Sequence, residues 1–424
     1  MAHPLLSLAA DYRAGKKPGI TSVCSAHPVV IEAALRHGLS KNRPVLIEAT
    51  CNQVNQDGGY TGMTPADFRA FVFAIADRVG YARDRIILGG DHLGPNPWKH
   101  LPADQAMAKA DVMIAAFAAA GFTKLHLDTS MGCKGEPVAL ADAITAERAA
   151  RLAAMAEAHR QGTDAPVYVI GTEVPVPGGA VDGLDHLQIT EPASVATTYD
   201  IHRRAFEAAG QSDAFSRVIA LVVQPGVEFG HDAVIHYAPE KARALSAALS
   251  DLPTIVFEAH STDYQTESGL RQLVRDGFSI LKVGPWLTFA LREALYGLDA
   301  IADVMDGKPP RNGLMQAMEA VMQAAPANWA KYYHGSETDL WVQRHFSYSD
   351  RIRYYWPEPK AEAAVKALMN RLSGRALPAP ILRQYLTAPP ESASTEMHMI
   401  VVNAVQAVLD TYHAAIWQEI EEKP

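Results

Sequence analysis

The chain is dominated by a regular alternation of short apolar runs with alanine-rich stretches of helical spacing, which continues to about residue 300. The apolar runs are rich in β-branched residues, as is typical of strands that are buried on both faces of a parallel sheet. The expected strands are Thr21–Cys24, Pro44–Ala49, Arg85–Gly89, Lys124–Asp128, Val167–Gly171, Arg217–Val223, Thr254–Glu258 and Ser279–Val283. Each is followed by a stretch of helical periodicity, such as Ala66–Val79. Eight such units predict an α/β protein with a closed (β/α)8 TIM barrel.

A doubly wound open sheet is the alternative fold for such a pattern. That fold binds a dinucleotide through a Gly-x-Gly-x-x-Gly motif after its first strand, and no such motif follows Thr21–Cys24. Eight units also suit a closed barrel better than an open sheet. We therefore favour the barrel.

Beyond Asp306 the alternation ends. Residues 308–311 have the composition of a linker, and helical spacing returns in Leu314–Ala324, Lys360–Leu372 and Met397–Glu421. We expect two parts: a barrel over residues 1–306, and a helical C-terminal extension over residues 307–424 that packs on the barrel. The last helix is amphipathic, and its apolar face is compatible either with packing on the barrel or with binding a partner protein.

Composition narrows the class of function. The chain has 424 residues and a formal net charge of -9, which argues against a surface for nucleic acid or for an anionic membrane. No apolar run approaches the ~18 residues of a membrane span, and no secretory signal pattern opens the sequence. Cys24, Cys51 and Cys133 are widely separated, without a CxxC pair. This usage fits a reducing compartment, so we expect a cytoplasmic protein.

Polar residues follow nearly every expected strand, at the end where a barrel enzyme assembles its active site. The third strand leads into Gly89-Gly90, which we expect to turn the backbone sharply, and then into Asp91-His92. The other strand ends carry Glu48 with Asn52 and Gln53, Asp128, Glu173, Gln224 with Glu228, Glu258 with His260, Ser261 and Asp263, and Lys282 with Gly284. One polar strand end is commonplace, but seven together predict a site.

His92 and His260, with Glu173 and either Gln224 or Asp91, form a nitrogen and oxygen donor set suited to Zn²⁺, Mn²⁺ or Co²⁺. These residues lie far apart in the sequence, so only the barrel would bring them together. The alternative is that the two histidines simply form hydrogen bonds in a polar barrel mouth.

Asp91, Asp128 and Glu173 are the candidates for proton transfer, because a carboxylate beside a metal ion can move a hydroxyl or carbon-bound proton. The alternative role for Asp128 is to support a metal ligand through a hydrogen bond. We expect His126 to face away from this group and favour a structural role for it.

A second set of residues is expected to bind substrate. Ser261 and the backbone at Gly284 lie where barrels often bind phosphate, and Lys282 would add charge there. Glu48, Asn52, Gln53 and Asp263 are further candidates. In the segment Ser347–Trp356, Arg351 or Arg353 would serve as an anion clamp, with Arg351 preferred; a packing interface is the alternative.

Several long motifs carry a family resemblance. They begin at Ser22 (Ser-Val-Cys-Ser-Ala-His-Pro), at Glu48 (Glu-Ala-Thr-Cys-Asn-Gln-Val-Asn-Gln-Asp-Gly-Gly-Tyr-Thr-Gly), at Gly89 (Gly-Gly-Asp-His-Leu-Gly-Pro-Asn), at Gly171 (Gly-Thr-Glu-Val-Pro-Val-Pro-Gly-Gly), at Glu258 (Glu-Ala-His-Ser-Thr-Asp-Tyr-Gln) and at Asp350 (Asp-Arg-Ile-Arg-Tyr-Tyr-Trp). Together they resemble the GatZ/KbaZ family, over essentially the whole chain. That family is described as the non-catalytic subunit of class II D-tagatose-1,6-bisphosphate aldolase, and also as tagatose 6-phosphate kinase.

The resemblance extends more remotely to the metal-dependent barrels of the class II aldolases. It implies that Asp91 is a proton-transfer acid and that His92 is a metal ligand, while Glu173 and, roughly, His260 match further site positions. At Gln224 the aldolase pattern has a ligand histidine, so ordinary aldolase metal chemistry does not carry over directly. Family members have also been assigned as C4 epimerases of sugars or sugar phosphates.

Two hypotheses follow. The first is a metal-dependent C4 epimerase of a ketohexose or its 6-phosphate in tagatose or galactitol metabolism, which interconverts fructose-type and tagatose-type sugars by retro-aldol and aldol steps. The second is a non-catalytic subunit that stabilises a class II aldolase. A kinase is not expected, since the chain has no Gly-x-x-x-x-Gly-Lys-Ser/Thr loop. The sequence does not decide whether the substrate is phosphorylated or which metal ion is used. It also leaves open whether epimerisation proceeds through cleavage of a carbon–carbon bond, and whether the chain forms oligomers.

Overall fold

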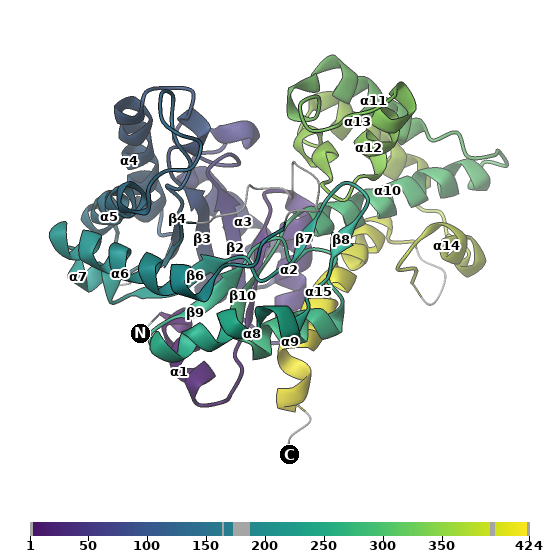
Figure 1. Cartoon of the computed structure of the whole chain (residues 1–424). Coiled ribbons are helices and arrows are strands. Elements are labelled where there is room, and N and C mark those ends of the chain that lie inside the picture. Colours follow the sequence, from purple (N-terminus) through teal and green to yellow (C-terminus); the bar gives the residue numbers. More distant parts are fainter. Residues whose placement is uncertain (1–2, 163–164, 173–186, 391–394, 422–424) are drawn as a thin grey trace.

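The computed structural model describes residues 3–162, 165–172, 187–390 and 395–421. Eight parallel strands close into a barrel in the order β1-β10-β9-β6-β5-β4-β3-β2 (Figure 1). The strands are β1 Ile20–Cys24, β2 Val45–Thr50, β3 Ile86–Leu93, β4 Lys124–Leu127, β5 Val167–Ile170, β6 Val218–Val223, β9 Val256–Ala259 and β10 Phe278–Val283. The predicted TIM barrel and all eight of its expected strands are confirmed.

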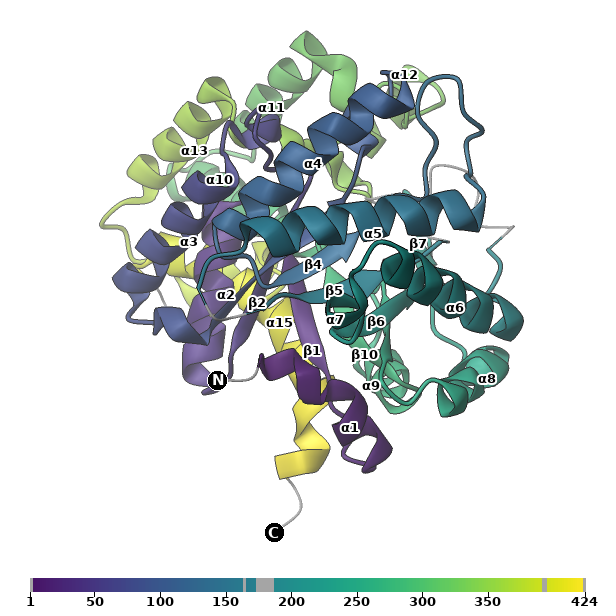
Figure 2. The same cartoon turned by 90° about the vertical axis from the view of Figure 1, so that its left-hand side faces the viewer.

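The helices of the barrel surround the strands (Figure 2). They are α2 Pro28–Ser40, α3 Pro65–Val79, α4 Ala103–Ala119, α5 Asp142–His159, α6 Pro192–Ala208, α8 Pro239–Ala247, α9 Glu267–Arg275 and α10 Pro285–Met305. Local sequence explains their ends. At the start of α3, Thr64 and Asp67 form a reciprocal capping box with Pro65 in the first turn, and Gly80 ends the helix with a φ of 75°.

Gly89 and Gly90 do not turn the backbone, contrary to our expectation. Strand β3 continues through them to Leu93, and neither glycine has a positive φ. Gly89 instead makes room inside the barrel, because a Cβ atom there would lie 2.6 Å from Cγ of Glu48. The glycine therefore lets a carboxylate occupy the barrel interior.

Short elements also form that the periodicity did not predict. They are α1 Leu8–Arg13, α7 Ser212–Phe215 and an antiparallel ribbon of β7 Glu228–Phe229 with β8 Val234–Ile235. The extension contains α11 Gly313–Ala324, α12 Glu337–Phe346, the 3-10 helix η8 Arg351–Tyr355, α13 Pro359–Leu372, α14 Ala379–Tyr385 and α15 Met397–Glu421. Of its α-helices, α12 and α14 were not predicted.

The last helix returns to the barrel. Helix α15 packs against α2, α9 and α10 and also contacts β1, so it covers the seam where the first and last strands pair (Figures 1 and 2). By length and composition Met397–Trp417 would suffice to cross a membrane, but half of this stretch is buried against the protein. We expected this helix either to cover the barrel or to bind a partner, and in the structure it covers the barrel. The boundary at residue 306 stays a prediction.

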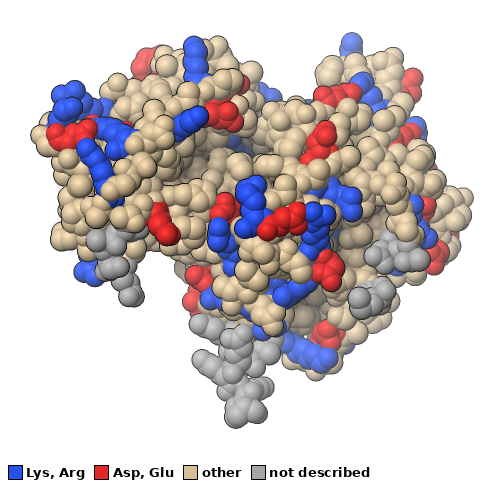
Figure 3. Space-filling model, turned by 180° about the vertical axis from the view of Figure 1, so that it is seen from behind, with Lys and Arg blue, Asp and Glu red and all other residues tan. Residues whose placement is uncertain are grey.

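On the face shown in Figure 3, basic and acidic side chains are interspersed. No uniformly basic area forms on that face among the residues drawn in colour.

Candidate metal and substrate site

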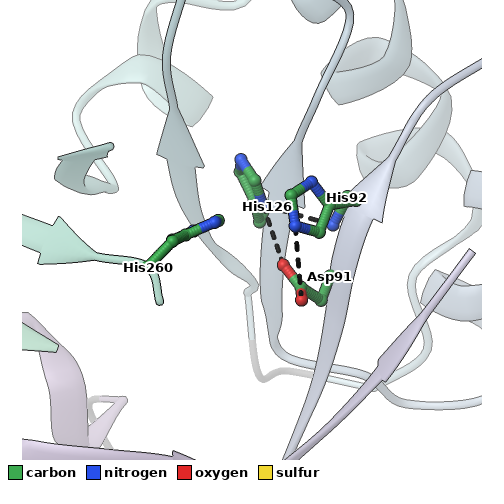
Figure 4. Close-up of side chains that lie close together, drawn as sticks. All are labelled: Asp91, His92, His126 and His260. Atoms are coloured by element: carbon green, nitrogen blue, oxygen red, sulfur yellow. Dashed lines mark hydrogen bonds and ion pairs between the residues drawn. The ribbon is translucent and has the colours of Figure 1, made fainter. Parts of the chain in front are cut away.

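Three imidazole rings and a carboxylate meet at the carboxyl end of the barrel strands (Figure 4). Asp91 and His92 come from β3, His126 from β4, and His260 directly follows β9. The three ring centroids lie 5.0 to 5.2 Å apart. All four residues are buried, and each offers a ligand atom within 4.8 Å of the others. We call these four residues the His3Asp cluster.

His126 belongs to this cluster, which corrects the prediction that it faces away. Residues two apart on a strand share a face, so His126 lies on the same inner face as Lys124, and as Asp128 just beyond the strand. Its Nδ1 lies 2.9 Å from Oδ1 of Asp91, and its buried Nε2 has no hydrogen-bond partner. Strand parity was the signal in the sequence that would have identified it.

Asp128 supports His92 from behind. Oδ2 of Asp128 lies 2.7 Å from Nδ1 of His92, and Ser130 donates its hydroxyl to Oδ1 at 2.9 Å. Burial by itself would raise the pKa of Asp128, but the hydrogen bond and charge of His92 lower it to about 2. Asp128 thus stands in the supporting position that was one of its two expected roles.

Below the cluster lies a buried layer of alternating charges. Nζ of Lys124 lies 2.6 Å from Glu48 and 2.7 Å from Glu258. Nζ of Lys282 lies 2.8 Å from Glu48 and 2.5 Å from Asp91. Burial opposes the charge of Lys282, but these carboxylates raise the pKa of its ammonium group well above its usual range. Lys282 is therefore a fixed cation bound to carboxylates.

His260 and His92 differ in the direction in which their surroundings shift the pKa of the imidazole. Burial lowers the pKa of His260 to about 3, although its Nε2 lies 2.9 Å from Oε1 of Glu258. The neutral form is the one that ligates metal ions. For His92, burial is outweighed by Asp91 and Asp128, which raise the pKa of the imidazole.

The residues present fit a divalent cation. The buried carboxylates of Glu48, Asp91, Asp128 and Glu258 face only two ammonium groups, those of Lys124 and Lys282. Among the described residues this leaves an excess of negative charge, which a bound cation would offset. The unpartnered Nε2 of His126 adds a donor, and imidazole with carboxylate suits Zn²⁺, Mn²⁺ or Co²⁺.

Glu173 and Gln224 were the other two expected ligands. Glu173 falls outside the described residues. The side-chain oxygen of Gln224 accepts the backbone N–H groups of Gly226 and Val227 at 2.8 and 3.0 Å. That oxygen is occupied by the loop after β6, and Gln224 does not line the pocket that contains Asp91, His92 and His260.

A pocket opens above the cluster. It is lined by Cys24, Thr50, Asn52, Gln53, Tyr60, Asp91, His92, Phe229, His260, Ser261, Asp263, Lys282, Val283, Gly284, Pro285, Arg353 and Tyr354. Most of the expected substrate-binding residues thus line one pocket, while Glu48 lies below it, bound to Lys282. Cys24, Thr50, Tyr60 and Phe229 were not anticipated.

The expected phosphate position at Gly284 is already occupied. Asp263 accepts the N–H groups of Gly284 and Trp286 at 2.9 and 2.8 Å and so caps the start of α10. Burial raises the pKa of Asp263 to about 6 against the effect of these hydrogen bonds. The Gly284 amide therefore has a partner within the protein.

The extension supplies Arg353, rather than Arg351, to the pocket. Arg351 lies with its guanidinium carbon 3.4 Å from the ring centroid of Tyr332, and its Nε donates to the carbonyl of Asn328. Arg353 lines the pocket beside Tyr354. The segment thus serves both uses that we considered, since one arginine packs within the extension and its neighbour reaches the pocket.

The family model described as D-tagatose-1,6-bisphosphate aldolase subunit GatZ/KbaZ-like matches residues 5–417. The chain belongs to the GatZ/KbaZ-like family. The resemblance inferred from the motifs is therefore confirmed.

Relatives of this GatZ/KbaZ-like protein carry different names. The chain is 56% identical over 415 residues to D-tagatose 6-phosphate 4-epimerase of Agrobacterium fabrum (strain C58), covering 97% of this chain and 98% of that protein. A crystal structure of a probable tagatose 6 phosphate kinase from Sinorhizobium meliloti 1021 is 58% identical with a TM-score of 0.86, covering 94% of this chain and 100% of that one. A fructuronate-tagaturonate epimerase from Cohnella laeviribosi, 11% identical with a TM-score of 0.52 over 93% and 81% of the chains, shares the fold.

Strained backbone also marks the site of this GatZ/KbaZ-like chain. His92 and Ser261 adopt positive φ values of 48° and 53° without being glycine, and Asp350, at the start of η8, has a φ of 43°. Such conformations cost about 1–3 kcal/mol each and persist where the surroundings impose them. His92 and Ser261 lie at the carboxyl end of the barrel strands and line the pocket.

Proposed function

We propose that this protein is a metal-dependent C4 epimerase that interconverts fructose-type and tagatose-type ketohexose 6-phosphates in the cytoplasm. The observation that carries the proposal is the meeting of the His3Asp cluster at the floor of a pocket. The 56% identity to a protein named D-tagatose 6-phosphate 4-epimerase supports it. Phosphoryl transfer is disfavoured because the chain lacks a Walker-type loop.

In this proposal His92, His126 and His260 hold the divalent cation, Zn²⁺ or else Mn²⁺ or Co²⁺. Such an ion, when bound, polarises the C2 carbonyl of a ketose. His126 takes the place that we had expected for Gln224, whose oxygen is occupied by backbone N–H groups. Asp128 orients the His92 ring through its hydrogen bond to Nδ1.

Asp91 is the proposed proton acceptor, because it lines the pocket and is held ionised by Lys282 and His126. It takes the proton of the C4 hydroxyl. The C3–C4 bond breaks, its electron pair passes into the C2–C3 enediolate, and C4 becomes an aldehyde. The aldehyde turns over, C3 adds to its opposite face, and Asp91 returns the proton to O4. The net change is inversion at C4.

Proton NMR on metal-reconstituted, partner-free protein tests this function. We expect each of fructose 6-phosphate and tagatose 6-phosphate to give rise to the other. The His126→Ala variant should lower the rate at least about 100-fold, whereas His202→Ala, which removes a buried histidine that does not line the pocket, should retain the activity. The absence of interconversion by the wild type with every metal would contradict the proposal.

The family description favours a second candidate function, that of a subunit which stabilises a class II aldolase. In that case an added class II aldolase subunit would gain activity or thermal stability from this chain, and the His126→Ala variant would support it equally well. The buried charged cluster argues for catalysis, because a companion subunit has no need to keep ionised groups inside its barrel.

A further inference from the structure

Arg353 is a cation that lacks an anionic partner. Within the described part of the chain, no carboxylate oxygen lies within 4.0 Å of its guanidinium nitrogens. Two other buried arginines of this region do have such partners, whereas buried Arg351 packs on the Tyr332 ring and donates to the carbonyl of Asn328. Arg292 pairs with Asp350 at 3.2 Å, and Arg344 pairs with Glu319 at 2.5 Å. A partly buried guanidinium without a carboxylate is costly unless a ligand supplies the negative charge.

The surroundings hold Arg353 in place rather than neutralise it. Its Nη1 donates to the carbonyls of Ser349 and Asp350, and its Nη2 donates to the Tyr354 hydroxyl at 2.9 Å. All of these acceptors are uncharged. The Tyr354 ring in turn packs edge-to-face on Tyr60, with centroids 5.0 Å apart. The guanidinium is therefore positioned in advance without a direct ion pair among the described residues, and the carboxylates of Asp350 and Asp263 act on its charge only at longer range.

Arg353 also stands where a barrel often binds phosphate. It shares the pocket with Ser261 and Gly284, which follow the seventh and eighth barrel strands. The Gly284 amide donates to Asp263 and is not free for a ligand. The guanidinium is thus a donor with spare capacity on this side of the pocket, since its hydrogen bonds to the described residues use only its Nη atoms, and its planar fork matches a phosphate.

We infer that Arg353 binds the 6-phosphate group of the substrate, beside Tyr60, and that the C-terminal extension thereby selects phosphorylated over free ketohexoses. The inference rests on the proposed function and deepens it, since the His3Asp cluster acts on the sugar carbons while the extension holds the phosphate. It assigns the extension a role in substrate recognition.

The test compares Arg353→Met with Lys331→Gln. Lys331 is an exposed cation of the same extension that does not line the pocket. We expect Arg353→Met to lower kcat/KM for fructose 6-phosphate by about 10- to 200-fold, the loss of a charge-assisted pair. Its kcat/KM for free fructose should stay within about threefold of the wild type, and Lys331→Gln should change neither value. Equal behaviour of the two variants toward fructose 6-phosphate would overturn the inference.

Binding experiments separate this inference from the proposed function. Calorimetry with fructose 6-phosphate and with inorganic phosphate should show binding to the wild type and its loss in Arg353→Met, even if no turnover occurs. Phosphate binding that survives in Arg353→Met, with epimerisation intact, would overturn the inference and leave the function standing. A wild type that binds neither probe would also overturn it.

A further measurement does not depend on the folding of a variant. An arginine-specific dicarbonyl reagent is applied to the wild type, and the modified residues are mapped by mass spectrometry. Fructose 6-phosphate should protect Arg353, and free fructose at the same occupancy should not. Equal modification of Arg353 with and without bound fructose 6-phosphate would contradict the inference.

Discussion

His126 and His202 are both buried histidines whose Nε2 atoms have no hydrogen-bond partner among the described residues, yet their surroundings differ. His126 faces Asp91 and two further imidazole rings. His202 lies in α6, and its Nδ1 donates to the carbonyl of Thr198 one turn earlier at 2.8 Å. Burial alone therefore does not identify a ligand, because the neighbouring groups decide the chemistry.

At this scale we predict that His126→Ala releases the metal while His202→Ala does not. Removing one of three imidazole donors should weaken metal affinity by at least about 100-fold. Metal content after dialysis, measured by inductively coupled plasma mass spectrometry, checks the prediction. Wild-type metal content in the His126 variant would contradict it.

We also predict that substitutions of the two residues that support His92, Asp128 and Ser130, weaken metal binding to different extents. Asp128→Asn keeps the shape of the side chain but removes the charge that orients the imidazole, so metal affinity should fall about 10- to 100-fold. Ser130→Ala removes only one hydrogen bond to Asp128 and should have a smaller effect. Competition with a chromogenic chelator measures both affinities. The reverse order of the two effects would count against the supporting role of Asp128.

At the scale of elements, several helices bury or hold histidines that do not line the pocket. Helix α6 buries His202, the N-cap of α2 is His27, and α12 buries His345. Burial lowers the pKa of each imidazole to about 4, from an ordinary value of 6.5. The folded protein thus keeps these rings neutral where the unfolded chain would protonate them.

The pH dependence of stability follows from that difference. Below pH 6.5 the unfolded chain binds more protons, so the free energy of unfolding falls as the pH is lowered from 6.5 toward 4. His202 alone should cost about 2 kcal/mol by pH 5. Urea unfolding of the wild type and of His202→Gln at pH 7 and pH 5 should show a smaller pH effect in the variant. An identical pH effect in both proteins would refute the assignment.

At the scale of the whole molecule, the end of the chain completes the barrel. Helix α15 packs against α2, α9 and α10. The Tyr412 hydroxyl donates to the carbonyl of Thr262 at 2.8 Å, two residues after His260. The extension therefore touches the site from two directions, through Arg353 in the pocket and through Tyr412 behind the β9 end.

We predict that Val405→Asp unfolds or strongly destabilises the whole protein, because Val405 is fully buried on α15 and an unpaired carboxylate there costs several kcal/mol. Asn403→Asp places the same charge on the exposed face of that helix and should change the free energy of unfolding by less than about 0.5 kcal/mol. Urea unfolding followed by tryptophan fluorescence and circular dichroism compares them. Equal stability of the two variants would show that α15 is dispensable.

The sequence by itself determined the strands, most helices and the barrel, because hydrophobic periodicity and capping residues act over a few neighbouring positions. It also identified Asp91, His92, His260 and most of the pocket lining, since residues at strand ends face one mouth in a barrel.

Only the tertiary structure decided which of these groups meet. The partners of His126, the backbone contacts of Gln224, and the choice of Arg353 over Arg351 depend on register and on long-range packing. The same is true of α15, whose apolar face was compatible with several partners until the fold placed it on the barrel. Such contacts join positions that lie far apart along the chain, and no local pattern encodes them.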